Sequence, residues 1–89
     1  MPSFLLKTYE IVDEKKYDSI ITWTEDGEKF IIKKLSDFSE IILPKFFKHN
    51  NFSSFIRQLN MYDFHKTKKE SGIQCFEHGL FLKDKKHLL

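Results

Sequence analysis

The stretch KFFKHNNFSSFIRQLNMYDF, residues 45–64, carries the clearest structural pattern in this chain. Between residues 52 and 61 the apolar side chains recur at helical spacing, which predicts one buried stripe formed by Phe52, Phe55, Ile56 and Leu59. Asn51 stands just before this stripe, where its side chain can accept a hydrogen bond from an unpaired N–H group of the first turn. The same spacing places Ser54, Arg57, Gln58 and Met61 on a second, mostly polar face.

The residue types on this second face suit the reading of base edges. Arginine can donate two parallel hydrogen bonds to guanine, and glutamine or asparagine can pair with adenine. Arg57 is the only arginine, and the other fourteen basic residues are lysines, which bind phosphate as point charges but lack the planar fork. From helical spacing alone, however, an ordinary amphipathic helix with a solvated polar face is the more frequent meaning.

The order of residues adds to this reading. Residues 43–64, LPKFFKHNNF-x-SF-x-RQLN-x-Y-x-F, closely resemble the signature of the DNA-binding domains of heat shock transcription factors. The resemblance implies an α+β winged helix-turn-helix domain, with three helices packed on a small antiparallel sheet of about four strands. It also implies that the third helix, about residues 52–62, lies in the major groove of double-stranded DNA with GAA repeats.

Two groups of site residues are expected on this basis. The base-reading group has Arg57 as the candidate for the guanine of GAA, together with Ser54, Gln58 and Asn60. The group that positions the domain on phosphates consists of Lys48, Asn51, Tyr62 and Lys66. Basic and amide groups that flank a reading helix supply contacts of this second kind.

Length and charge agree with a small nucleic-acid-binding module. Eighty-nine residues suffice for one domain, which we expect to span residues 1–89. Residues 1–44 hold six Lys and nine Asp or Glu, a net −3, whereas residues 45–89 hold nine Lys or Arg and four Asp or Glu, a net +5. A basic region attracts polyanions, although a solvated charged surface is the commoner meaning of such a region. The single cysteine, Cys75, excludes an internal disulfide, and no apolar run has the length of a membrane span.

The remaining elements are predicted from local patterns. An apolar helical stripe follows Pro2 and extends to about Val12. Residues 20–23 and 30–33 read as a β-hairpin, with Gly27 in a turn that needs a positive φ, and Trp23 in the core. Residues 64–67 and 73–77 alternate as a second hairpin, the wing, with a short polar loop at residues 68–72.

The second helix is expected to begin with a capping box and to be distorted near its end. Ser36 or Asp37 would cap it, with Glu40 completing the box. A buried stripe is predicted at Phe38, Ile41, Ile42 and Phe46. Pro44 lies within this pattern and should kink or break the helix.

Several residues depart from the family pattern. Members usually have an apolar residue where Thr8 stands and Trp where Tyr9 stands, which concerns core packing. They usually have Gly where Asp63 stands, and an acid beside a DNA-binding face should weaken binding unless its side chain turns away. Near the end of the chain, Gly79 and Asp84 replace a usual Pro and Gly, and the wing loop is shorter than in most members.

Catalysis is not indicated by any motif, and no cofactor is expected. Cys75-x-x-His78 resembles half a zinc site, but a second ligand pair at suitable spacing is missing, so no metal is expected. The chain has no Gly-rich phosphate loop and no nucleophile elbow. The alternative to a DNA-binding module is a winged-helix domain that binds proteins. Such a domain would more often expose apolar side chains on the face that carries Arg57, because interface cores are depleted in charge.

The resemblance also implies how the intact protein assembles. The family trimerises through a coiled coil outside this domain, and residues 1–89 contain no heptad repeat. We therefore expect this chain to be a monomeric fragment, to bind one GAA unit weakly, and to belong to a homotrimer. The resemblance implies action in the nucleus, with shuttling from the cytoplasm left open.

Overall fold

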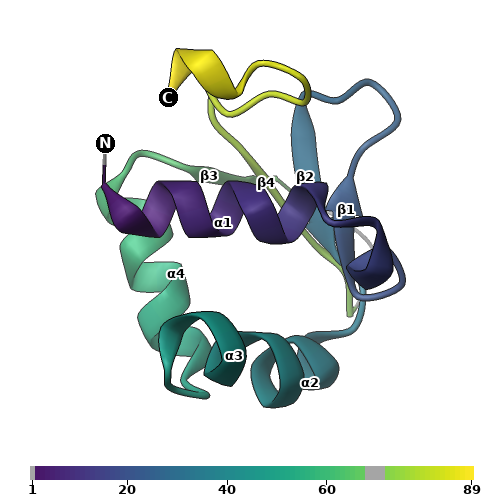
Figure 1. Ribbon diagram of the computed structural model, residues 1–89, viewed down its shortest axis with the longest axis vertical. Coiled ribbons are helices and arrows are strands. Elements are labelled where there is room, and N and C mark those ends of the chain that lie inside the picture. Colours follow the sequence, from purple (N-terminus) through teal and green to yellow (C-terminus); the bar gives the residue numbers. More distant parts are fainter. Residues whose placement is uncertain (1, 68–71) are drawn as a thin grey trace.

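The computed structural model describes residues 2–67 and 72–89, and in this part of the chain helices pack against a four-stranded antiparallel sheet (Figure 1). The strands are β1 (Ile21–Trp23), β2 (Lys29–Ile32), β3 (His65–Thr67) and β4 (Gln74–Glu77), in the order β1-β2-β4-β3. The helices are α1 (Ser3–Asp13), α2 (Leu35–Asp37), α3 (Leu43–Phe47) and α4 (Phe52–Met61). Shorter helical segments are η1 (Lys15–Tyr17), η2 (Phe38–Ile42) and η3 (Lys86–Leu88). The expected α+β winged helix-turn-helix architecture is confirmed.

The wing hairpin is joined to the first hairpin through the pairing of β2 with β4. Phe30 lies opposite Phe76 in this pair, and their ring centroids are 5.4 Å apart. The strands begin within one residue of their predicted positions, and the wing hairpin pairs Lys66 with Phe76. The predicted wing loop lies mostly outside the described residues, which resume at Gly72.

The turn between β1 and β2 requires glycine for two reasons. Gly27 has a φ of 72°, and a Cβ atom at this position would lie 3.0 Å from Cβ of Lys83. The Gly27 carbonyl also accepts a hydrogen bond from the Lys83 N–H at 2.9 Å, so the C-terminal segment lies directly against the turn. Asp26 accepts hydrogen bonds from the Thr24 hydroxyl and the Glu28 N–H, which lower the pKa of its carboxyl group. The predicted positive φ of this glycine is confirmed.

Helix α1 closes the core with two residues that depart from the family pattern. Thr8 is fully buried, and its hydroxyl donates to the Phe4 carbonyl at 2.8 Å, which satisfies the polar group inside the protein. The Tyr9 ring packs edge-on against Trp23 and Phe81, while its hydroxyl donates to the Leu82 carbonyl at 2.9 Å. Burial raises the pKa of the Tyr9 phenol. Trp23 is buried, as predicted.

The segment Leu35–Phe47 is continuously helical, and Pro44 neither breaks it nor caps it. The chain widens into a π-helical turn at η2, where the Leu43 N–H bonds to the Phe38 carbonyl, and Pro44 follows in the first turn of α3. A π-turn next to proline accommodates the missing N–H and the bulky ring within the helix. The predicted irregularity near Pro44 is therefore present as a π-helical turn, and the helix does not break there.

Two further expectations for this segment are wrong. Asp37 has helical backbone angles, and Lys34 is the N-cap without a side-chain hydrogen bond, so the capping box with Ser36 or Asp37 does not form. Ile41 is 52% exposed, whereas Leu43 is fully buried. A wider turn changes the angular spacing of the residues that follow, so the α-helical spacing assigned Ile41 to the wrong face.

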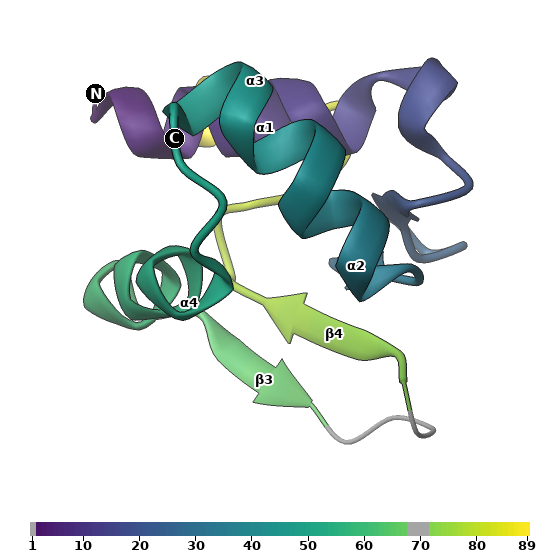
Figure 2. The same cartoon turned by 90° about the horizontal axis from the view of Figure 1, so that it is seen from below.

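Helix α4 is fixed in rotation by aromatic packing. Phe55 and Leu59 are almost fully buried, and Phe52 and Ile56 pack against the core from the edges, as the stripe predicted. The Phe55 ring centroid lies 5.0 Å from that of Phe38 and 5.5 Å from that of Phe4. In Figure 2, α3 overlaps α1 near the top of the view and α4 lies below them.

Core truncation on α4 tests this arrangement. Phe55→Ala or Leu59→Ala should lower the free energy of unfolding by about 2–5 kcal/mol, because each removes buried apolar surface and leaves a cavity. Ser54→Ala, on the other face, is the matched control and should be nearly neutral. Urea denaturation followed by circular dichroism measures all three, and a larger loss for Ser54→Ala than for Phe55→Ala would contradict the assignment of faces.

Candidate nucleic-acid interface

The turn that leads into α4 is held by two short polar contacts. Oδ1 of Asn51 accepts a hydrogen bond from the Ser54 N–H at 3.1 Å, which confirms Asn51 as the N-cap. The Asn51 N–H in turn donates to Nδ1 of His49 at 3.0 Å, and the His49 ring stacks on Phe47 with centroids 6.3 Å apart. His49 is not among the site residues expected from the sequence, although a histidine two residues before a capping asparagine could have suggested the bond.

The expected base-reading residues share the outer face of α4. Arg57, Gln58 and Asn60 are exposed, while Ser54 is half-buried near the start of the helix. The ion pairs between described residues, Lys29 with Glu77 and Lys86 with Glu10, do not involve Arg57. The guanidinium therefore remains available to an outside acceptor as far as residues 2–67 and 72–89 are concerned. A helix with a rigid buried side and such donors on its outer side can enter a major groove.

Lys48 and Lys66 flank this face from neighbouring elements. Lys48 follows α3 with a φ of 61°, a left-handed conformation that favours glycine, and its side chain is exposed. Lys66 is exposed on β3, the strand that follows α4. Both positions are compatible with phosphate contacts on either side of a groove.

Tyr62 lies apart from the rest of the expected set. It is the C-cap of α4, and its half-buried ring stacks on Phe4 of α1 with centroids 5.8 Å apart. Its helical position turns it away from the face that carries Arg57. The structure thus brings seven of the eight expected residues to α4 or its exposed flanks and places the Tyr62 ring against α1.

Asp63 terminates α4 in a position where glycine is favoured. Its φ is 66°, its N–H donates to the Asn60 carbonyl at 3.1 Å, and the Phe64 N–H donates to the Leu59 carbonyl at 3.0 Å. These two bonds form a Schellman motif, whose left-handed residue is usually glycine. The departure from the family pattern at Asp63 therefore affects the backbone conformation as well as the charge. Asp84 also has a left-handed conformation, with a φ of 62°.

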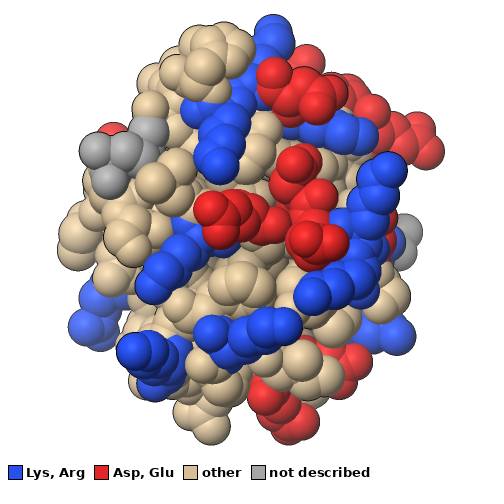
Figure 3. All heavy atoms as spheres, viewed as in Figure 1, with Lys and Arg blue, Asp and Glu red and all other residues tan. Residues whose placement is uncertain are grey.

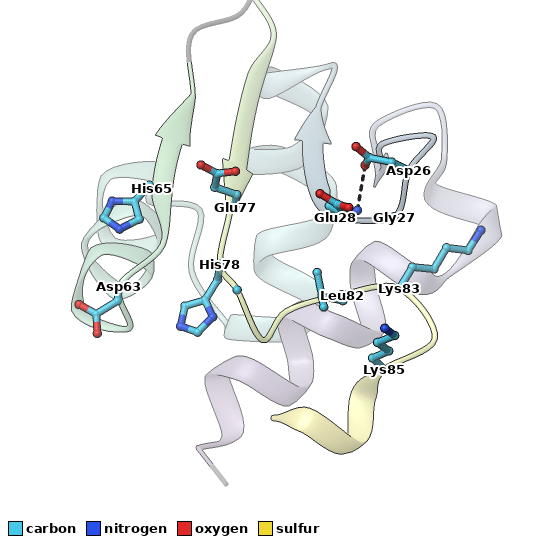
Figure 4. A pocket seen from close by; sticks show the side chains of 11 residues that line it. Asp26, Gly27, Glu28, Asp63, His65, Glu77, His78, Leu82, Lys83 and Lys85 are labelled. Carbon is cyan, nitrogen blue, oxygen red and sulfur yellow. Dashed lines mark hydrogen bonds between the residues drawn. The ribbon is translucent and has the colours of Figure 1, made fainter.

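A pocket of about 600 Å³ lies beside Asp63, between the end of β4 and the C-terminal segment (Figure 4). Asp63, His65, Glu77 and His78 line one side of it, and Asp26, Glu28 and Lys83 line the other. Within residues 2–67 and 72–89, no three His, Cys, Asp or Glu side chains are grouped so that they could hold a metal ion. The pocket mixes both charges and gives no reason to place a polyanion there.

The face that α1 presents is also mixed in charge. Figure 3 shows acidic side chains near the middle of this face, with basic side chains around them. Glu10, Asp13 and Glu14 line a shallow pocket there together with Lys16 and Lys45. A polyanion would meet carboxylates on this face, so the exposed side of α4 is the better candidate surface. No helix in the described part of the chain is long and apolar enough to cross a membrane.

Comparison with known proteins defines the class to which this fold and face belong. The family model described as HSF-type DNA-binding matches residues 4–89. Heat stress transcription factor A-4a of Arabidopsis thaliana is 47% identical over 89 residues, which are 100% of this chain and 22% of that protein. Heat stress transcription factor A-5 of the same plant is 50% identical over 97% of this chain and 18% of that protein. The chain thus spans about a fifth of the length of these relatives.

Solved structures agree with the family match. Skn7 of Chaetomium thermophilum, crystallised with HSE DNA, has a TM-score of 0.91 and 40% identity, over 97% of this chain and 93% of that one. A heat shock transcription factor–DNA complex has a TM-score of 0.80 and 38% identity, over 88% of this chain and 95% of that one. This chain belongs to the HSF-type DNA-binding family, a family of transcription factor domains and not of enzymes.

Replacement of Asp63 separates its backbone effect from its charge. Asp63→Gly should raise the free energy of unfolding by up to about 1 kcal/mol, because the left-handed conformation costs an L-residue more than it costs glycine. Asp63→Asn keeps the size of the side chain and removes only the charge. Both variants should bind DNA more tightly than the wild type, as measured by fluorescence anisotropy, and a gain confined to Asp63→Gly would show that the charge is irrelevant.

Proposed function

We propose that residues 1–89 act as one DNA-binding domain that reads GAA units of heat shock elements through α4 in the major groove. The observation that carries this proposal is the outer face of α4, where Arg57, Gln58 and Asn60 are exposed on a helix held by a buried aromatic cluster. Support comes from relatives solved with DNA, Skn7 with HSE DNA among them. A preformed face of this kind loses little conformational freedom on binding.

The individual roles follow from chemistry and position. Arg57 donates two hydrogen bonds to the guanine of GAA, and Ser54, Gln58 and Asn60 contact the adjoining bases directly or through water. Lys48 and Lys66 bind phosphates on the flanks. The capping bond leaves the Asn51 amide NH₂ group to donate to a phosphate, and Tyr62 contributes through its hydroxyl group.

The intact protein acts in the nucleus as a transcription factor in this proposal, and shuttling from the cytoplasm is compatible with it. The isolated domain is a monomer that binds one GAA unit weakly. A homotrimer, joined by a coiled coil outside these residues, places linked domains on successive GAA repeats and raises their effective concentration. The alternative, a protein-binding winged helix, is less well supported because the outer face of α4 carries mostly polar side chains and one guanidinium.

Arg57→Lys is the sharpest test of the proposed role in base reading. The variant keeps the charge but loses the planar fork, so specific binding to a GAA duplex should weaken by about 1–3 kcal/mol. Binding to a scrambled duplex of equal length should hardly change, because phosphate contacts are retained. Thermal stability should also be preserved, since the side chain is exposed. Equal affinity of wild type and Arg57→Lys for the GAA duplex would exclude Arg57 as the reader of guanine.

Salt dependence tests the two flanking lysines. Lys48→Ala and Lys66→Ala should each weaken binding to GAA and scrambled duplexes alike, and each should lower the slope of log K against log salt by about one unit. Lys48→Gly removes the same charge but relieves the positive φ, so it should match Lys48→Ala in slope and exceed it in stability. The control is Lys15→Ala, which removes the same charge from an exposed residue of η1. A slope as steep as that of wild type would remove Lys48 or Lys66 from the phosphate contacts.

A further inference from the structure

Met61 is an apolar residue in the middle of a polar face. It is the last residue of α4, and its side chain is 65% exposed, more than the exposed side chains of Ile41, Leu80 and Leu88. At about 100° per residue, Met61 lies about 40° around the helix axis from Arg57 and about 160° from the buried Leu59. Single exposed apolar residues are common, but this one shares the face proposed to enter the groove.

Its place along the helix puts Met61 close to Arg57. Met61 follows Arg57 by four positions, a rise of about 6 Å along α4. Successive bases on one strand are about 3.4 Å apart, so this distance is comparable to about two base-pair steps. On the proposed function, Arg57 reads the guanine of GAA, and Met61 is then within reach of an A·T pair of the same unit.

The chemistry of the side chain selects the thymine of that pair. In the major groove an A·T pair presents the N7 and N6 groups of adenine, the O4 of thymine and the thymine 5-methyl group. The Met61 thioether is at best a weak hydrogen-bond acceptor, so it reads the polar groups poorly. A long, unbranched and polarizable side chain packs well against a methyl group. We infer that Met61 reads the 5-methyl group of a thymine opposite the adenines of GAA and so contributes to specificity.

A duplex that lacks only this methyl group isolates the contact. Each thymine opposite GAA is replaced in turn by deoxyuridine, and affinities are measured by fluorescence anisotropy at one fixed salt concentration. Wild type should bind one of the two substituted duplexes about fourfold more weakly, the value of about 0.8 kcal/mol for one buried carbon group. Met61→Gln, which has a similar length and is polar, should bind the thymine and deoxyuridine duplexes equally.

Two further variants serve as controls. Met61→Leu keeps an apolar side chain and should keep a preference for thymine, while Lys15→Ala, exposed at η1, should keep the thymine preference of wild type. Thermal melts of Met61→Gln verify that the fold is intact, as expected for an exposed position.

The outcomes separate this inference from the function on which it rests. A wild type that binds GAA and scrambled duplexes equally would overturn both. A wild type that prefers GAA but does not distinguish thymine from deoxyuridine would overturn the role of Met61 alone. The same holds if Met61→Gln retains the full preference for thymine, because another residue then contacts the methyl group.

Discussion

The packing of Phe55 determines which side of α4 meets the solvent. Its ring lies within 6.1 Å, centroid to centroid, of the rings of Phe4, Phe38, Phe47 and Phe52. These neighbours come from α1, η2, α3 and α4 itself, so four helical segments contribute to one cluster. Aromatic rings prefer tilted and edge-on arrangements, which makes such a cluster sensitive to rotation. A helix held in this way presents Arg57 at the same angle in every molecule, as a groove-reading helix requires.

The irregular helix before the turn serves the same cluster. The π-turn at η2 buries Phe38, Ile42 and Leu43 together, and Phe38 contacts both Phe52 and Phe55 of α4. Regular α-helical spacing predicted a buried Ile41, which is exposed instead. The π-helical bond from the Leu43 N–H to the Phe38 carbonyl thus belongs to the segment against which α4 packs. Sequence periodicity assumes one helical geometry throughout and could not indicate this change.

Most of the fold and the outer face of α4 could be predicted from the sequence, for different physical reasons. The buried stripe of Phe55 and Leu59 follows from helical periodicity. Gly27 was predictable as a turn residue because it lacks a side chain, and Asn51 was predictable as an N-cap because its side chain accepts a hydrogen bond. The strands are short, but β-branched and aromatic residues mark them. The roles of Ser54, Gln58 and Asn60 were not predictable to the same degree, because exposed polar residues are constrained by a partner and not by the fold. The packing of the Tyr62 ring on Phe4 was not predictable, because this contact joins residues far apart in the sequence.

Two residues beside α4 occupy backbone conformations that glycine adopts more easily, and their side chains have opposite consequences. Lys48, before the N-cap, and Asp63, after the C-cap, have φ values of 61° and 66°. Strain of this kind is often found at functional sites, where the surrounding structure maintains it. At Lys48 the exposed side chain carries a positive charge, so a contact with phosphate, as proposed above, would offset the backbone cost. At Asp63 the charge has the opposite sign, so a contact with phosphate would not offset that cost. The hydrogen bonds of the Schellman motif, to the carbonyl groups of Asn60 and Leu59, are donated by the backbone of residues 63 and 64. They can therefore form with either aspartate or glycine at position 63. Because these bonds do not depend on the side chain of residue 63, the aspartate is not needed for the end of the helix.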